Sequence, residues 1–317
     1  MRKEAKTERQ IEHGIISGYH RGDSQHERKL VFASDRPFEA DRQYRLLSDG
    51  SMLPQFGIEV ETQNWNIIGN TAYANILKHI IFETFPNDLW KFEEDCSLNQ
   101  HGCKSFAECI TQPMTKAFIR NHYKDFKVMF NWFSDLGTDC TKTGDCGMHT
   151  HMSITNFGRS KAVQDEAIRK FVYMVNKHYD FMMVLVNRRL DAWDETGYFG
   201  RMPVTKAECQ NMDLSMGYND HNVCINLGHY NEGDIEFRLV GGQKNYACFR
   251  NTMESVFHLI EASKRISWND TDDLVKIFKG CNNYVFNRIS TNCFRANQIN
   301  AEQIEAIRPT VITKEFL

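Results

Sequence analysis

The sequence predicts an α+β fold in which strands alternate with single helices and some strands form hairpins. Two segments, 55–62 and 147–154, alternate in polarity with the period of a half-buried strand. Three longer segments, 70–85, 160–190 and 246–266, repeat apolar residues with helical spacing. We find no internal repeat and no low-complexity tract.

The remaining elements follow from turn signals and shorter patterns. A helix is predicted over 115–136, and Gly137 is suited to end it. Residues 90–113 indicate strands and turns, and 191–220 are rich in loop-forming residues. Two short strands, about 222–228 and 233–240, are joined by a turn around Asn231–Asp234.

Composition limits the classes of function. The 317 residues are 41% hydrophobic and 25% charged, which suits one large globular domain or two small ones. The 38 basic and 41 acidic residues nearly balance, so no electrostatic footprint for nucleic acid or an anionic membrane is expected.

The sequence also suggests a compartment. The chain opens with charged residues and no apolar run follows, so no signal peptide is predicted. The apolar stretch Phe181–Val186 is far too short to span a bilayer. Ten cysteines without a Cys-x-x-Cys pair indicate reduced thiols. We therefore expect a cytoplasmic protein.

Residues 1–52 form a polar N-terminal arm in this interpretation, and 53–317 form the globular part. The arm is rich in charged and amide residues and has few apolar ones. Two alternatives stay open: an arm that wraps the main body or mediates assembly, and a solvated tail.

Glu59 and Glu61 are the first candidate functional residues. They lie two residues apart on a predicted strand, so both carboxylates point to the same face. Two carboxylates side by side repel each other unless a divalent cation lies between them. The alternative is an edge strand with a solvated acidic face.

His149 and His151 repeat this spacing with imidazoles, and histidine is the commonest metal ligand. A structural zinc site that adds Cys140 and Cys146 is an alternative, although the spacing is irregular for known zinc motifs.

Glu236 and Arg238 form a third pair on one strand face. A salt bridge would explain this pair. The functional alternative places Glu236 on a metal and Arg238 on a phosphate, which the planar guanidinium fits well. If the three strands share a sheet, the pairs converge on one cavity that suits phosphoryl transfer.

Two of these segments resemble glutamine synthetases. Gly147–Ile154 resembles their Gly-Met-His-x-His-x-Ser segment, and Ile235–Arg238 resembles their Ile-Glu-x-Arg strand. Asn245 and Tyr246 stand near the position of an Asn-Pro-Tyr in that family.

Three earlier segments are similar to the putative amidoligase family, which belongs to the same carboxylate–amine ligase superfamily. They are Phe56–Glu61, Asp95–Leu98 and Ala107–Pro113. The resemblance covers about residues 54–266, and the motifs occur in the family's order.

The resemblance implies a glutamine-synthetase-like fold: a curved antiparallel sheet with the active site on its concave face and helices on the other side. It implies an amidoligase-like catalytic domain over 53–317. The implied reaction is ATP- and Mg²⁺-dependent amide-bond formation through an acyl phosphate, with Mn²⁺ as a possible substitute for Mg²⁺. The substrates would be a carboxylate and an amine, each from a small molecule, a peptide or a protein.

Site residues are carried over position by position. The implied metal ligands are Glu59, Glu61, Glu108, His149 and Glu236. For Glu108, the alternative is an ordinary exposed strand residue.

The implied phosphate contacts come from histidine and basic residues. His151 and Arg238 would hold the nucleotide phosphates and the transferred phosphoryl group. Arg188 and Arg189 follow a long helix, where related enzymes place phosphate- or substrate-binding residues, and Lys244 is a weaker candidate. Compensation of the helix dipole is the alternative for the two arginines.

The chain departs from the family pattern in several places. Asp95-Cys96-Ser97 has no glycine, Asn245 is not followed by proline, and no ammonium-site signature is evident. The first 50 residues do not resemble the amino-terminal domain of glutamine synthetase, so we do not expect a glutamine synthetase itself. A homo-oligomer is compatible with the family, whose synthetases share active sites between subunits.

Two other function classes remain as alternatives. One is a metal-dependent phosphohydrolase or phosphotransferase that uses the same residues. The other is a non-catalytic assembly protein that retains the fold.

Overall fold

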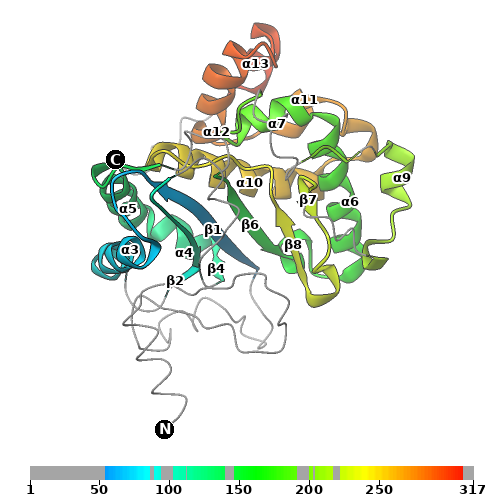
Figure 1. The fold of residues 1–317 in the computed structure, drawn as a ribbon. Coiled ribbons are helices and arrows are strands. Elements are labelled where there is room, and N and C mark those ends of the chain that lie inside the picture. Colours follow the sequence, from blue (N-terminus) through cyan, green and yellow to red (C-terminus); the bar gives the residue numbers. More distant parts are fainter. Residues whose placement is uncertain are drawn as a thin grey trace. The chain divides into compact units, whose positions relative to one another are not determined.

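The computed structural model describes residues 54–85, 89–93, 103–111, 113–139, 146–190, 200–202, 204–216 and 222–309. The predicted N-terminal arm lies outside these ranges. The chain divides into two compact units. Figure 1 labels the helices and strands, with colours that follow the sequence. Unit 1 comprises Met1–His149 and Gly242–Tyr246, and unit 2 comprises Thr150–Gly241 and Ala247–Leu317.

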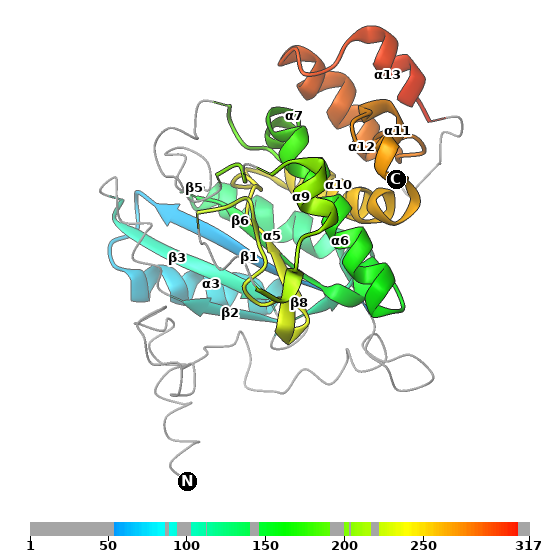
Figure 2. The ribbon, with the colours of Figure 1, turned by 90° about the vertical axis from the view of Figure 1, so that its right-hand side faces the viewer.

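Unit 1 is built on antiparallel strands in the order β2-β3-β1. These are β1 (Gln55–Asn64), β2 (Trp90–Glu93) and β3 (Ser105–Thr111), seen side by side in Figure 2. Two short strands, β4 (Met114–Thr115) and β5 (Thr138–Asp139), also pair antiparallel with β1. The predicted strand at 55–62 is confirmed. Strands β3, β4 and β5 all pair with β1, and β2 pairs with β3.

Helices α3 (Asn70–Thr84) and α5 (Tyr123–Asp135) supply the core of unit 1. Apolar residues of α3 that follow helical spacing, including Leu77 and Ile81, are fully buried. The rings of Phe85, Trp90 and Phe126 pack edge-on or tilted, with centroids 4.9–6.2 Å apart.

The helix predicted over 115–136 is divided at His122 into α4 (Lys116–Asn121) and α5. His122 Nδ1 lies 2.9 Å from the carbonyl oxygen of Phe118, and the imidazole stacks on the Phe118 ring. The amide of His122 still donates to the same carbonyl at 3.0 Å, and the break lies in the backbone of His122, whose φ of −100° and ψ of 14° are not helical. Gly137, with φ of 68°, follows the last turn of α5 in the left-handed conformation expected after a helix.

Unit 2 has antiparallel strands in the order β6-β8-β7. They are β6 (Met148–Ser153), β7 (Ile225–Asn226) and β8 (Asp234–Phe237). The first two residues of β6 belong to unit 1 and the others to unit 2. β7 and β8 are shorter than the predicted strands at 222–228 and 233–240.

The helix predicted over 160–190 is divided at His178 into α6 (Lys161–Lys177) and α7 (Tyr179–Leu185). His178 Nε2 lies 3.1 Å from the carbonyl oxygen of Thr271, a contact across 93 positions. Phe171 of α6 packs edge-on against Phe237 of β8, with centroids 5.6 Å apart, so α6 covers a face of β8.

The predicted helix at 246–266 is α10 (Tyr246–Arg265). Residues after 266, for which the sequence predicts no element, form further short helices, three of them α-helical. The short elements of unit 2 are α9 (Lys206–Gln210), α11 (Leu274–Phe278), α12 (Asn283–Arg288), a π-helical turn (Ile289–Cys293), α13 (Ala301–Ile307) and 3₁₀ turns at Ile154–Phe157, Leu214–Met216, Tyr230–Glu232 and Trp268–Asp270.

The architecture is therefore mixed α and β with antiparallel strands, as the sequence predicts at the level of fold class. Among the described residues, none of the helices is both long enough and apolar enough to cross a bilayer.

Candidate functional site

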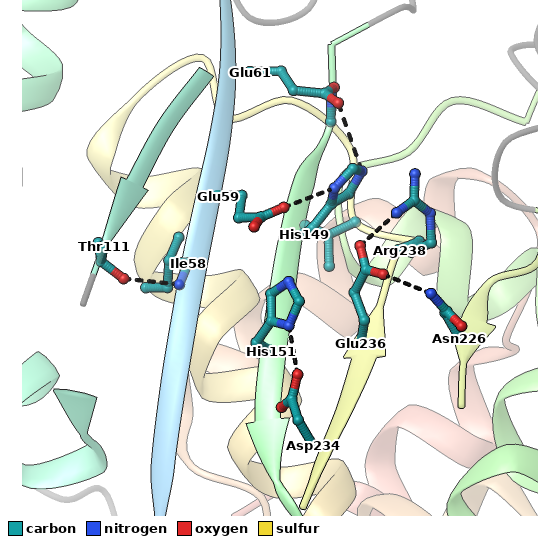
Figure 3. Close-up of polar contacts among 12 residues, drawn as sticks. Ile58, Glu59, Glu61, Thr111, His149, His151, Asn226, Asp234, Glu236 and Arg238 are labelled. Carbon is teal, nitrogen blue, oxygen red and sulfur yellow. Dashed lines mark hydrogen bonds and ion pairs between the residues drawn. The ribbon is translucent and has the colours of Figure 1, made fainter. Parts of the chain in front are cut away.

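A carboxylate–histidine cluster lies in unit 1 and consists of Glu59, Glu61, Glu108 and His149. Strand β1 supplies the first two residues, β3 supplies Glu108 and the start of β6 supplies His149. His149 Nδ1 lies 3.4 Å from Glu59 Oε2, and His149 Nε2 lies 3.7 Å from Glu61 Oε1 (Figure 3). One ligand atom each of Glu59, Glu108 and His149 lies within 4.8 Å of the others.

The backbone holds Glu61 in place. The amide of Gly147, just before β6, donates to Glu61 Oε2, and the amide of Glu61 donates to the Gly147 carbonyl at 3.1 Å. Glu61 is therefore anchored to the residue that leads into His149.

Two of the three acidic residues of the cluster are buried, and Glu59 is half-buried. Glu61 is 7% exposed and Glu108 is 1% exposed. These two residues are direct partners in the antiparallel register of β1 and β3. Directly opposite residues bring like charges close together, which is destabilising. The alternatives of a solvated acidic face on β1 and of an exposed Glu108 therefore do not hold.

The donor set fits a divalent cation. Carboxylate oxygens suit Mg²⁺, and carboxylates with one imidazole also suit Mn²⁺. A cation among Glu59, Glu108 and His149 would offset the repulsion between buried carboxylates. The residues that the sequence predicts as ligands on β1, β3 and β6 are thus brought together in unit 1.

A second group, which we call the β8 cluster, lies in unit 2 and consists of His151, Asn226, Asp234, Glu236 and Arg238. Glu236 is 4% exposed. Arg238 Nη1 donates to Glu236 Oε1 at 2.5 Å, and Asn226 Nδ2 donates to Glu236 Oε2 at 3.0 Å (Figure 3). The salt bridge considered from the sequence is thus present. Binding of a cation by Glu236 stays a prediction.

Asp234 holds the ring of His151. Its Oδ2 lies 2.6 Å from His151 Nδ1 (Figure 3). This contact orients the imidazole ring. The sequence does not predict this role or that of Asn226. The alternation Asp234-x-Glu236-x-Arg238 is the available signal, but Asp234 also falls in the predicted turn.

The other predicted phosphate-binding residues have different surroundings. Arg188 is 7% exposed, and its guanidinium donates to the carbonyl oxygens of Arg238, Leu239 and Val240. Arg189 and Lys244 are exposed. Phosphate binding by these three residues stays a prediction.

The zinc alternative finds no support in the part of the chain that the structure describes. Every group of residues there that could hold a metal consists of carboxylates and imidazoles, with no thiol. Cys146 is buried as a free cysteine, and Cys140 lies outside the described residues.

The two clusters belong to different units, and their convergence on one cavity stays a prediction. No protein-family model matches the chain, and a search of curated proteins finds no significant match.

Proposed function

We propose that the chain is an ATP- and Mg²⁺-dependent carboxylate–amine ligase that acts through an acyl phosphate. The observation that carries the proposal is the buried carboxylate–histidine cluster, in which Glu61 and Glu108 face each other across two strands. Its like charges are most simply reconciled with burial by a bound cation, and its motifs resemble those of amidoligases.

The reaction needs an activated carboxylate. A carboxylate is a poor electrophile because its leaving group would be oxide, whereas an acyl phosphate releases phosphate. Glu59, Glu61, Glu108, His149 and Glu236 would hold Mg²⁺ or Mn²⁺, which when bound screens the charge of the nucleotide phosphates. The substrate carboxylate takes the γ-phosphoryl group, and an amine then displaces phosphate to give an amide, ADP and phosphate.

Arg238 and His151 are positioned for the phosphoryl group in this proposal. The Glu236 ion pair orients the Arg238 guanidinium, whose planar fork fits phosphoryl oxygens. Asp234 orients the His151 ring in the same way, through its contact with Nδ1. Such preorganised donors stabilise charge that develops during phosphoryl transfer.

Strand β6 carries one histidine of each cluster. His149 of the first cluster and His151 of the second are two residues apart on this strand. Side chains with that spacing point to the same face of a strand.

Calorimetric titration with ATP and Mg²⁺ tests the proposal. The wild-type protein is expected to bind ATP only with Mg²⁺ present. Glu59→Gln and Glu236→Gln keep the side-chain shape and remove one proposed ligand charge from each cluster. Each is expected to weaken binding at least about 100-fold, the loss of roughly 2.7 kcal/mol of binding energy.

Glu232→Gln is the matched control, because Glu232 is an exposed carboxylate four residues before Glu236. It should leave binding unchanged. No ATP binding by the wild-type protein, or equal binding by all variants, would refute the ligase and favour an assembly protein. Steady phosphate release without an amine acceptor would favour the phosphohydrolase.

A further inference from the structure

The turn after α7 is held from two sides by buried arginines. Its residues Val184–Arg188 include Asn187, whose φ of 67° lies in the left-handed region. Asparagine tolerates this conformation better than most residues. Such a turn persists only where the surrounding structure determines it.

Arg288 of α12 holds one side of the turn. Its Nε donates to the carbonyl of Leu185 at 3.2 Å, and its Nη2 donates at 3.0 Å both to the Val184 carbonyl and to Asn187 Oδ1. Arg288 is 7% exposed, and burial lowers the pKa of its guanidinium. The carbonyls at the carboxyl end of α7 replace the water that this charge has lost.

Arg188, the last residue of the turn, holds the segment after β8. Its Nη2 donates to the Val240 carbonyl at 2.8 Å and to the Arg238 carbonyl at 3.3 Å, and its Nε donates to the Leu239 carbonyl at 3.3 Å. The rigid fork of the guanidinium can bind several carbonyls at once, which an ammonium group cannot match.

The two segments are also in direct backbone contact. The amide of Gly241 donates to the Val186 carbonyl at 3.0 Å. A Cβ atom on Gly241 would lie 2.2 Å from the Asn187 carbonyl oxygen, so only glycine allows this approach.

We propose that Arg188, held in place by Arg288, is a positioning residue that fixes the backbone of Arg238–Val240 and thereby directs the Arg238–Glu236 ion pair. Arg188 binds the carbonyl of Arg238 itself, so a shift of this backbone moves the base of the Arg238 side chain. In this scheme Arg288 acts through the turn that it binds. The catalytic consequence of this positioning rests on the proposed function, whereas the effect of Arg188 on the backbone does not.

Hydrogen exchange read by mass spectrometry tests the backbone effect without nucleotide. The amides of Arg238 and Gly241 are hydrogen-bonded in the native protein, so peptides that cover Arg238–Gly241 should exchange slowly. Arg188→Gln is expected to speed their exchange at least about tenfold. Arg188→Lys should fall between this variant and the wild type, and Arg288→Gln should show the same local change.

Arg169→Gln is the matched control. Arg169 also donates from Nε to a distant carbonyl within unit 2, that of Met212 at 2.8 Å, but it is not bonded to the segment after β8. In the Arg169→Gln protein, hydrogen exchange of the Arg238–Gly241 amides should stay as in the wild type. All variants are compared well below their melting transitions.

Binding of ATP and Mg²⁺ by the same samples gives the second readout. If Arg188 and Arg288 position Arg238, the Arg188→Gln and Arg288→Gln proteins should bind ATP at least about tenfold more weakly. The amides of α6 and α10 should still be protected from hydrogen exchange. Unchanged local exchange, a uniform increase across unit 2, or faster local exchange with unaltered ATP affinity would each overturn the proposal. Failure of the wild-type protein to bind ATP refutes the ligase instead, and the exchange comparison then still decides whether Arg188 fixes the strand.

Discussion

Replacing Glu108 with Gln is expected to weaken Mn²⁺ binding about 100-fold and to raise the melting temperature of the metal-free protein. Glu108 is 1% exposed and lies opposite Glu61 across β1 and β3. Without a cation, removing one of two facing carboxylate charges relieves repulsion of about 1 kcal/mol. A gain of this size raises the melting temperature by about 1.5 °C in a chain of 317 residues.

A substitution that weakens Mn²⁺ binding but stabilises the metal-free protein identifies a residue whose role is to bind the metal. Mn²⁺ affinity can be measured by titration, and the melting temperature by calorimetry with and without a chelator. Glu166→Gln serves as the control, because Glu166 is a half-exposed carboxylate on α6 whose Oε1 lies 3.2 Å from Lys170 Nζ. A Glu108→Gln protein that is less stable without metal and binds Mn²⁺ normally would mean that Glu108 has a structural role.

Replacing Gly241 with Ala is expected to cost more than about 3 kcal/mol of unfolding free energy. The new Cβ atom would lie 2.2 Å from the carbonyl oxygen of Asn187 and 2.9 Å from the Cα atom of Arg188. Both are backbone atoms, so rotation of a side chain cannot relieve the clash. The turn after α7 and the segment after β8 must then separate, which breaks the carbonyl contacts of Arg188.

Gly233→Ala separates steric from conformational effects. Gly233 has φ of 90° but has open space around its Cβ position. Alanine there should cost only the backbone strain, about 1–2 kcal/mol. Urea unfolding of both variants gives the comparison. Equal losses for the two variants would contradict the close backbone approach at Gly241.

Local periodicity accounts for the elements that the sequence predicts well. Strand β1 and helices α3 and α10 agree with their predicted ranges within a few residues, because their apolar spacing is regular and long. The breaks at His122 and His178 have no glycine or proline to announce them. At both breaks the imidazole contacts a carbonyl oxygen, and for His178 that carbonyl belongs to the distant Thr271.

Distant contacts account for what could not be predicted. β8 ends at Phe237, and the next three carbonyls are bound by Arg188 instead of by a neighbouring strand. The helices after residue 266 are too short for periodicity, although the Asn300 and Gln303 capping box marks the start of α13.

The candidate site shows the same division. Strand alternation places Glu59 and Glu61 on one face from sequence alone. Only the register of β1 and β3 places Glu108 opposite Glu61, and only the structure places Asp234 on His151.

Pulsed electron paramagnetic resonance of the wild-type protein with Mn²⁺ and ATP is the most direct test of a metal–nucleotide site at the carboxylate–histidine cluster. Mn²⁺ replaces Mg²⁺ as the paramagnetic probe. We predict a nitrogen coupling from the His149 imidazole, lost in His149→Gln, together with a phosphorus coupling from the nucleotide. A phosphorus coupling without the nitrogen coupling would mean that the metal and nucleotide bind elsewhere, and the absence of both would contradict the proposed site.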